Sequence, residues 1–436
     1  MAYMKDSTGR RLDSIAVPAA TEVLPKWKAS TTYAANDLAL SPTGDVIAAK
    51  AGFTSGTVFD SSKWRTIVPA DPFRYDSTRL VQWRAAVAQV ATRPARLVVV
   101  GDSIWEGYGA SAAAKRDIEI LRDRLRQRLQ PAGVAGGEGY VPAFYVSTTM
   151  PQRLSGTTGV LTQRTDLAGL GQRVGIIGVG GSIRTMTFTG TGLDIYYTQG
   201  SPAGTFTYAI DGGAATSVNS NNATLKGGLI AQVRGLSAGS HTLTLTATTG
   251  GNGMYFEGVE VYNGDEAAGI HVLDGSHSGW QSDDFATGGT TAPGLWYDSL
   301  NASAPDLVLI SLGVNDWRSG SQTRLTSAQT KSNLQTLIAN IRSKVTSAPS
   351  IGLMIPYSVA DPGSTPEAWP NYRKAIHDVA QADGKCALID LDAVAAGGFV
   401  GTTDPYALNY GTDYIHPNDK LHAMLGTAVA NVLLSA

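Results

Sequence analysis

The sequence contains a single cysteine, Cys386, among 436 residues. One cysteine excludes both an intrachain disulfide framework and a zinc site built from several thiolates. An excess of charge of one sign is also missing, because 34 Lys and Arg residues nearly balance 36 Asp and Glu residues, for a formal net charge of −2. The composition therefore does not favour nucleic acid, an anionic membrane or an acidic substrate as a partner.

Long apolar runs are absent as well. No uninterrupted stretch of about 18 apolar residues occurs, so we expect no membrane insertion. The opening Met1-Ala-Tyr-Met-Lys-Asp6 lacks the basic-then-apolar order of a secretory signal peptide. Charged residues make up only 16% of the chain, against about 25% in an average protein. Together with 50 glycines, the low charge content favours a β-rich, extracellular protein. Given the opening residues, we expect such a protein to leave the cell without a signal peptide.

The N-terminal part of the chain divides into two segments of different pattern. Residues 1–20 are polar and aperiodic, which predicts an N-terminal arm. Residues 21–70 hold short apolar stretches between turn signals, which predicts a small β module. The aromatic residues of this module are either the core of an undersized domain or an exposed, carbohydrate-binding platform; they are Trp27, Tyr33, Phe53, Phe59 and Trp64.

The rest of the chain alternates between two patterns. Apolar strand-like runs and helical periodicity alternate through residues 76–165 and 266–436, which predicts an α/β fold: a parallel sheet covered by helices on both faces. Residues 170–265 alternate with a period of two, which predicts an inserted antiparallel β-sandwich. We expect the parallel strands at 96–100, 270–273, 307–310, 351–355 and 387–389, and the helices at 78–92, 112–130, 327–345, 367–382 and 417–434.

Reactive side chains follow the expected strands. The ligand site of an open parallel sheet lies beyond the carboxyl ends of its strands, and Ser103 follows the first strand while Asp413 and His416 precede the last helix. A serine becomes a nucleophile when a base lies within hydrogen-bond reach and a third group orients that base. We predict Ser103 as the nucleophile, His416 as the base and Asp413 as the orienting carboxylate. Pro417 suits the first position of the last helix.

A tetrahedral oxyanion would need preorganised hydrogen-bond donors. The candidates are the backbone N–H of Ser103, the backbone N–H of Gly279 and the side-chain amide of Asn315. Gly275 is a rival to Gly279.

A second histidine could be confused with the base. Asp274 precedes His277 by the same three residues that separate Asp413 from His416. His277 lies in a glycine-rich turn rather than before the closing helix, so we prefer His416. The other histidines are expected on sheet or helix surfaces; they are His241, His271, His377 and His422.

Four blocks of the sequence resemble the SGNH hydrolases, a branch of the GDSL esterases and lipases. Gly101-Asp102-Ser103 matches the first block, Gly279 the second, Gly313-Val-Asn315-Asp316 the third and Asp413-Tyr-Ile-His416-Pro417 the last. Ile104 stands where the family has Leu, a conservative change. The resemblance implies a flavodoxin-like three-layer domain, serine esterase chemistry, no metal and no cofactor.

Aromatic residues beside the blocks suggest the substrate. Trp105, Trp280 and Trp317 each lie within two residues of a block, and aromatic faces near a nucleophile are typical of sugar binding, although tryptophans also pack in cores. The segment Glu257–Asp265 is similar to the junction in carbohydrate esterases that carry a sandwich beside the SGNH domain. This resemblance implies an acylated carbohydrate substrate.

The N-terminal segments resemble parts of phage proteins. Met4–Asp13 is similar to the openings of minor tail proteins of actinobacterial phages, and Trp27–Trp64 to small chitin-binding-type modules and pieces of phage tail proteins. The resemblance implies a location in the virion tail, other tail proteins as partners, and O-acetyl groups of a host surface polysaccharide as the target. An inert carbohydrate-binding or structural tail protein, and a lipase or thioesterase for longer acyl chains, stay open, as does homo-oligomer formation. A histidine base predicts activity that rises through a midpoint near about pH 6.5.

Overall fold

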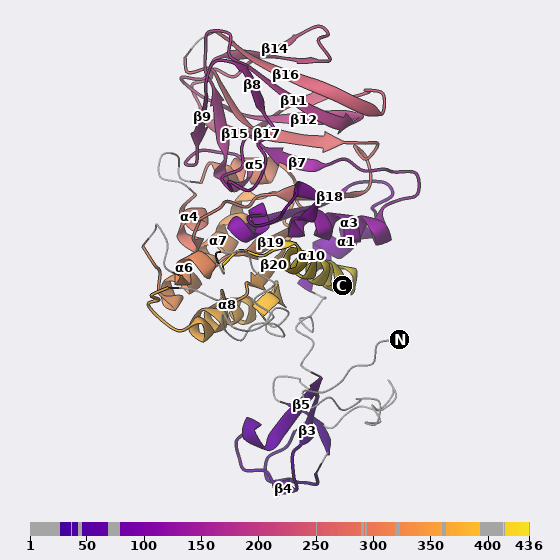
Figure 1. Cartoon of the computed structure of the whole chain (residues 1–436), viewed down its shortest axis with the longest axis vertical. Helices are drawn as coiled ribbons and strands as arrows, with labels where there is room; N and C mark the ends of the chain where they lie inside the picture. The colour runs from indigo at the N-terminus through magenta and orange to yellow at the C-terminus, as the bar shows by residue number, and fades with distance from the viewer. Residues whose placement is uncertain are drawn as a thin grey trace. The chain divides into compact units, whose positions relative to one another are not determined.

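The computed structural model describes residues 27–35, 37–41, 46–68, 79–249, 251–288, 292, 294–318, 323–359, 363–392, 413 and 415–435. The chain forms two compact units, Met1–Arg74 and Tyr75–Ala436 (Figure 1). The arm expected at residues 1–20 lies outside the described residues.

The first unit is a small β module. β1 (Thr32–Tyr33) pairs with β4 (Phe53–Thr54), and β3 (Val46–Ala49) pairs with both β2 (Leu38–Leu40) and β5 (Trp64–Val68). The rings of Tyr33 and Trp64 are buried and meet edge to face at 4.7 Å. Trp27, Phe53 and Phe59 pack around them, partly buried. The aromatic residues thus supply the core that so short a segment could not build from aliphatic residues alone.

The second unit has a parallel sheet at its centre. Its five strands lie in the order β18-β6-β19-β20-β21, which is the 2-1-3-4-5 arrangement of flavodoxin-like folds when they are renumbered along the chain. The α/β fold expected from the sequence is confirmed. The strands are β6 (Ala95–Gly101), β18 (Ile270–Asp274), β19 (Leu307–Ser311), β20 (Ser350–Ile355) and β21 (Cys386–Asp390).

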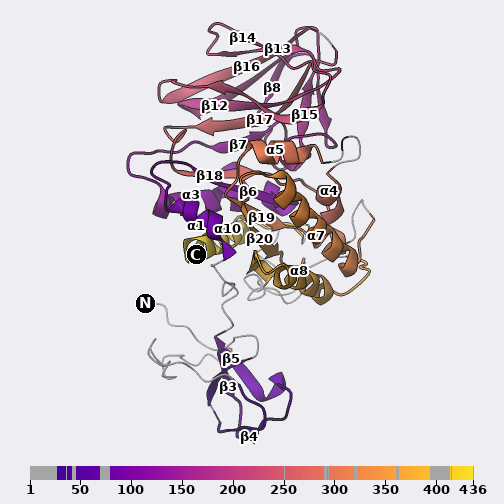
Figure 2. The same ribbon diagram turned by 180° about the vertical axis from the view of Figure 1, so that it is seen from behind.

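Helices flank this sheet in two groups (Figures 1 and 2). One group contains α3 and α10, which pack on each other, and the other contains α4, α7 and α8. In the described part of the chain, no helix is both long and apolar enough to cross a membrane. The helices are α1 (Val81–Val87), α2 (Ser103–Glu106), α3 (Asp117–Leu129), α4 (Ser282–Thr287), α5 (Trp296–Ala302), α6 (Val314–Trp317), α7 (Ser327–Lys344), α8 (Trp369–Asp383) and α10 (Asp419–Ser435).

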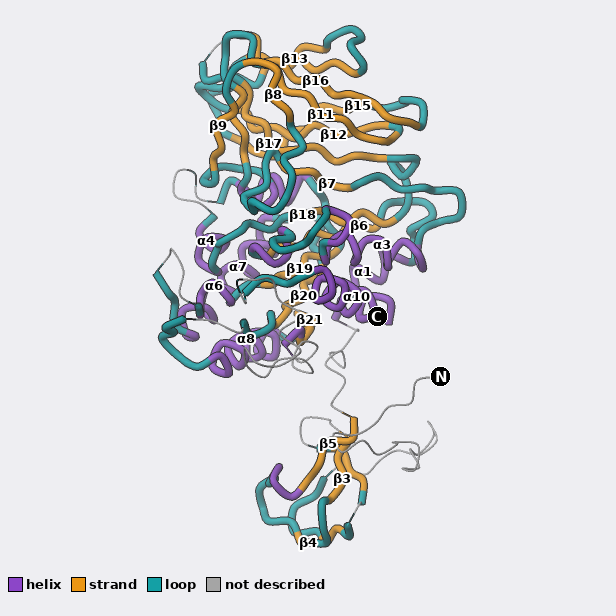
Figure 3. The backbone as a smooth tube through the Cα atoms, viewed as in Figure 1, coloured by secondary structure: helices purple, strands orange, loops and turns teal. Residues whose placement is uncertain are grey.

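The inserted segment is built mainly from strands and loops (Figure 3). A five-stranded antiparallel sheet, β14-β13-β16-β11-β8, packs against a layer formed by β15, β12, β17, β10 and β9. β8 and β9 precede residue 170, so the sandwich takes in residues upstream of the expected boundary. The strands are β8 (Ser155–Thr158), β9 (Leu161–Arg164), β10 (Val174–Ile177), β11 (Ile183–Gly190), β12 (Gly192–Gln199), β13 (Thr205–Ile210), β14 (Thr216–Asn219), β15 (Lys226–Val233), β16 (Gly239–Thr249) and β17 (Met254–Tyr262).

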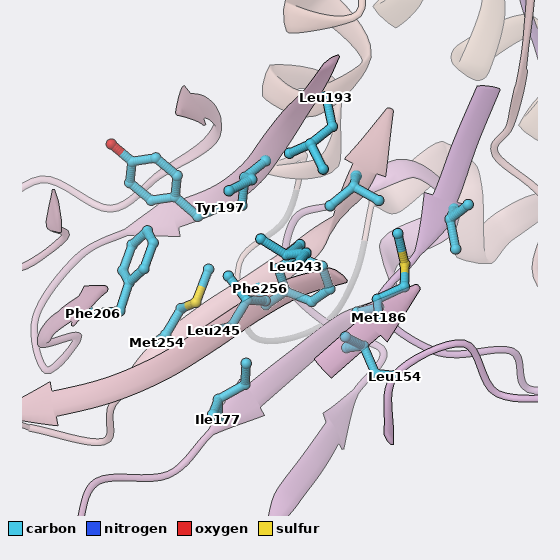
Figure 4. Close-up of a cluster of buried hydrophobic side chains, with 14 of the residues drawn as sticks. Leu154, Ile177, Met186, Leu193, Tyr197, Phe206, Leu243, Leu245, Met254 and Phe256 are labelled. Carbon is cyan, nitrogen blue, oxygen red and sulfur yellow. The ribbon is translucent and has the colours of Figure 1, made fainter. Parts of the chain in front are cut away.

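Buried and more exposed side chains alternate along the strands, and the buried ones form the core of the sandwich. In β11, Met186 and Phe188 are buried while the neighbouring threonines are more exposed, as expected for a strand with one face toward a core. Leu243 and Leu245 of β16 meet them from the same sheet, and Phe256 of β17 comes from the opposite layer (Figure 4). The period of two in the sequence therefore corresponds to the interior of a sandwich.

The sandwich and the parallel sheet share one continuous sheet. β7 (Gly139–Pro142) pairs antiparallel with β17 and parallel with β18, and so it joins the two parts. Beside this junction, Glu260 accepts hydrogen bonds from Arg96 (2.5 Å) and His271 (2.8 Å). Burial opposes ionisation of Glu260, but Arg96 and His271 outweigh it and hold the pKa of its carboxyl below the ordinary value.

The expectation that most histidines lie on surfaces is wrong. His271 is 2% exposed and His422 is fully buried, and His241 is also buried. In the interior, His271 Nδ1 hydrogen-bonds to Glu260 and His422 Nδ1 lies 3.4 Å from an Asp117 oxygen, contacts that the sequence pattern does not reveal.

Candidate active site

Ser103 lies just beyond the carboxyl end of β6. It is the first residue of the short helix α2, and the Asp102 side chain caps that helix by accepting a hydrogen bond from the Ile104 N–H at 3.0 Å. Gly107, with φ of 95°, ends the helix after one turn. This turn holds Ser103 at the carboxyl ends of the parallel strands, where ligands bind in open α/β folds.

Ser103, His416 and Asp413 form one hydrogen-bonded chain. The distance from Ser103 Oγ to His416 Nε2 is 2.7 Å, and the distance from His416 Nδ1 to Asp413 Oδ2 is 2.5 Å. Asp413 Oδ1 also accepts the backbone N–H groups of Ile415 and His416, each at 3.0 Å. Burial raises the pKa of the Asp413 carboxyl, but these hydrogen bonds outweigh it and hold that pKa below the ordinary value. Asp413 therefore stays ionised and orients the imidazole toward Ser103 Oγ.

Two tyrosines fix the His416 loop. The Tyr108 ring stacks on the imidazole with centroids 3.9 Å apart, and the Tyr357 hydroxyl donates a hydrogen bond to Ile415 O at 2.9 Å. Gly109, at φ of 90°, lies so close to this loop that a Cβ would come within 2.3 Å of Pro417 O. Sequence reasoning missed both tyrosines, although Tyr108 follows Ser103 by only five residues.

Pro417 does not occupy the first position of the last helix. α10 begins at Asp419, and Asn418 Oδ1 accepts hydrogen bonds from the N–H groups of Lys420 (3.0 Å) and Leu421 (3.2 Å). Asparagine is among the best N-cap residues, and it starts the helix two residues later than expected.

The second block contains two glycines with different environments. The N–H of Gly275 donates to Val99 O at 2.8 Å, so it is committed to the neighbouring strand β6. Gly279 has φ of 85° and lies at an exposed turn closed by the hydrogen bond from Trp280 N–H to His277 O at 3.3 Å. The hydrogen bond to Val99 O disfavours Gly275 as an oxyanion donor, and Gly279 stays the predicted donor.

Asn315 is tied to this turn. It lies on α6, after β19, and its side-chain amide donates to Trp280 O at 2.9 Å. The Gln281 side chain donates in return to Asn315 O at 2.9 Å. β19 runs parallel to β6 and pairs with it up to the Ser311–Gly101 position. Asn315 and the Gly279 turn therefore lie at the same carboxyl end of the sheet as Ser103.

His277 is not part of a second triad. Its Nδ1 donates to Gly171 O at 2.5 Å, and the Asp274 carboxylate pairs with Arg116 and Arg173 instead. Burial lowers the pKa of His277 to about 3, so the imidazole is neutral at working pH and its contacts are structural.

Two of the three tryptophans predicted to stack on sugar lie in the core. Trp105 is fully buried, and Trp317 is 6% exposed against Trp369, with ring centroids 4.9 Å apart. Trp280 is half-buried, with one face on His277 at 3.8 Å. The prediction that Trp105 and Trp317 stack on a sugar is therefore wrong. Closeness to a block in sequence does not decide which way a ring points.

Comparison with known proteins agrees with this geometry. Residues 255–424 match the GDSL-like Lipase/Acylhydrolase family, a range that holds Gly279, Asn315, Asp413 and His416 but not Ser103, which precedes the sandwich. No curated protein matches the chain by sequence. The family match and the Ser–His–Asp chain make this protein a carboxylic ester hydrolase.

A solved structure shares this fold, and others give weaker superpositions. A peptidoglycan O-acetylesterase superposes with a TM-score of 0.61 at 18% identity, over 83% of this chain and 97% of that chain. A two-domain esterase active on acetylated mannans gives a TM-score of 0.39 at 9% identity, over 84% of this chain and 55% of that one. A Corynascus thermopiles carbohydrate esterase family 2 enzyme gives 0.30 at 17% identity, over 63% and 99%.

Proposed function

We propose that this chain is a serine esterase that removes O-acetyl groups from a bacterial cell-surface polysaccharide. The observation that carries the proposal is the unbroken hydrogen-bonded chain from Ser103 Oγ through His416 to Asp413. It combines a nucleophile, a base and an orienting carboxylate at the carboxyl end of the parallel sheet.

The geometry supports a two-step acyl transfer. As Ser103 Oγ attacks the ester carbonyl carbon, His416 Nε2 accepts its proton, and Asp413 stabilises the resulting imidazolium. His416 then donates that proton to the leaving sugar oxygen, which leaves an acetylated Ser103. A water molecule, deprotonated by His416, releases acetate and restores the serine.

The negative charge on the tetrahedral oxygen would be met by three donors. These are the Ser103 N–H, the Gly279 N–H and the Asn315 side-chain amide. Each such donor contributes about 3 to 4 kcal/mol to transition-state stabilisation. The hydrogen bond from Asn315 to Trp280 O supports this grouping, because it holds the amide beside the Gly279 turn.

The carbohydrate substrate is supported by the fold. A structure that superposes over most of both chains is named as a peptidoglycan O-acetylesterase. Trp280, half-buried near the glycine turn, is the aromatic side chain that we propose for contact with the sugar.

The virion tail remains the proposed location. It rests on the likeness of Met4–Asp13 to phage tail proteins, a segment outside the described residues. Mass spectrometry of purified virions would test it: the protein should co-purify with tails, and its recovery only from lysed host cells would count against a tail role.

Acetate release from a panel of acetylated bacterial glycans tests the enzymatic proposal. Wild type should release acetate from at least one glycan and from p-nitrophenyl acetate, whereas Ser103→Ala should release none above background. Equal rates for the two proteins would refute it. A fall in rate when p-nitrophenyl palmitate replaces the acetate would separate an acetylesterase from a lipase.

A further inference from the structure

A fully buried carboxylate follows the nucleophile by three residues, in the same short helix. Glu106 ends the same helical turn that Ser103 begins, and its side chain has no exposed surface. Its Oε2 accepts the backbone N–H of Ser278 at 2.7 Å, and its Oε1 accepts the backbone N–H of Val146 at 2.5 Å. Glu106 thus links the Ser103 helix to the residue that precedes Gly279.

The turn that carries Gly279 is held at two of its four residues. Glu106 binds it at Ser278, and Asn315 binds it at Trp280 O, while the hydrogen bond between Trp280 and His277 closes it. The positive φ of Gly279 falls at the third position of this four-residue turn, as in turns that need glycine there. The direction of the Gly279 N–H therefore depends on the Glu106 carboxylate.

The charge of Glu106 is balanced by a buried cluster. Arg173 lies 3.4 Å from Glu106 Oε1 and 3.2 Å from Asp274, and Arg116 lies 2.9 Å from Asp274. All four side chains are at most 3% exposed. A buried carboxylate is tolerated only when it is paired and hydrogen-bonded, and the two oxygens of Glu106 accept the backbone N–H groups of Val146 and Ser278.

We propose that Glu106 is a positioning residue for the oxyanion hole, which aims the Gly279 N–H at the oxygen that becomes negative. The inference rests on the proposed function, because that proposal makes the Gly279 N–H a donor to the oxyanion. Glu106 acts through the turn and does not touch the substrate. Because the hole matters most in the transition state, loss of Glu106 should affect kcat and leave KM nearly unchanged.

Glu106→Gln and Glu106→Ala are the first variants, with Glu257→Gln as the matched control. Glu257 is also fully buried and also accepts a backbone N–H, from Gly228 at 2.9 Å, but it lies in β17 of the sandwich. On p-nitrophenyl acetate, Glu106→Gln should lower kcat by roughly 10- to 100-fold and Glu106→Ala by more. Glu257→Gln should keep the wild-type kcat per folded molecule, with folding followed by circular dichroism.

A transition-state analogue separates positioning from general damage. A small alkylboronic acid forms a tetrahedral anionic adduct with a serine oxygen, so its Ki reports on the oxyanion hole. In Glu106→Gln, Ki should rise by about the factor by which kcat falls. A merely structural role would reduce the amount of active protein and leave the Ki of the active fraction unchanged.

Ser278→Pro removes the other partner and keeps the proposal testable if Glu106 variants do not fold. Proline is favoured at the second position of such turns and lacks the N–H that Glu106 accepts. It should reproduce the loss of kcat and the rise in Ki, and the double variant with Glu106→Gln should lose little more. Wild-type kcat and Ki in these variants, or an equal loss in Glu257→Gln, would overturn the inference. Retained activity in Ser103→Ala would instead refute the proposed function.

Discussion

The phenol ring of Tyr108 stacks on the imidazole of His416, with ring centroids 3.9 Å apart and ring planes inclined by 27°. The N–H of Tyr108 also donates to Ser103 O at 2.9 Å. One residue therefore couples the backbone of the nucleophile to the ring of the proposed base, and it limits how far the imidazole can turn from Ser103 Oγ.

Replacement of Tyr108 should reduce turnover. An aromatic pair contributes about 0.5 to 1.5 kcal/mol beyond its buried area, so Tyr108→Leu should lower kcat by roughly 2- to 10-fold, while Tyr108→Phe, which keeps the ring, should stay close to wild type. Steady-state kinetics on p-nitrophenyl acetate measure both. If the Phe variant lost as much activity as the Leu variant, stacking would not be the relevant contact.

The two Asp-x-x-His pairs should differ sharply in kinetics. His416→Ala should lower ester turnover by several orders of magnitude, because it removes the proposed base. His277→Ala should act mainly on stability, since it deletes the hydrogen bond to Gly171 O and the stack on Trp280. Comparison of kcat/KM with the midpoint of thermal unfolding tests this, and the reverse ranking would exchange the two assignments.

Asp102 should make stability depend on pH. Burial raises the pKa of Asp102 to about 7, whereas an unfolded aspartate titrates near about 3.9. Between these values the folded state holds a proton that the unfolded state has released, so this group makes folding less favourable as pH rises from about 4 to about 7. Asp102→Asn keeps a capping side chain and removes the titration.

The free energy of unfolding of wild type and Asp102→Asn, measured by urea denaturation across this window, checks the sign. The variant should gain stability relative to wild type as pH rises. A difference that stayed constant from pH 4 to pH 7.5 would mean that Asp102 does not titrate there.

The tryptophans should separate substrate contact from packing. Trp105→Ala should cost about 3 to 5 kcal/mol of stability, the usual range for a deleted core aromatic residue, because the ring is fully buried. Trp280→Ala should leave turnover of p-nitrophenyl acetate nearly intact and raise KM for an acetylated polysaccharide. Unchanged KM on the polymer would remove Trp280 from the sugar site.

The parallel sheet could be predicted from sequence because its strands are buried on both faces. Runs such as residues 97–100 are apolar throughout, and Ser103 and Asn315 follow such runs after short loops. The contact between Asp413 and His416 could also be predicted from their spacing of three residues, because the carboxylate binds both the backbone N–H and the ring of His416 within one turn.

The buried charges could not be predicted in this way. Glu260 alternates with Val259 and Val261 along β17, a pattern that favours a solvent-facing side, yet Glu260 and Glu257 are both fully buried. Their partners, Ser299 and Arg96, lie on elements far away in sequence. Glu106 is similar: its amide partners are 40 and 172 residues away, so no local pattern could reveal its contacts.

The large unit should keep its esterase activity without the small one. Residues 1–74 and 75–436 form separate compact units, and every side chain of the proposed site belongs to the second. A chain that begins at Tyr75 should hydrolyse p-nitrophenyl acetate with wild-type kcat and KM. If the small module binds glycan, the same truncation should raise KM for the acetylated polysaccharide alone, whereas equal KM values on the polymer would leave the packed aromatic cluster of Tyr33 and Trp64 as a core without a binding role.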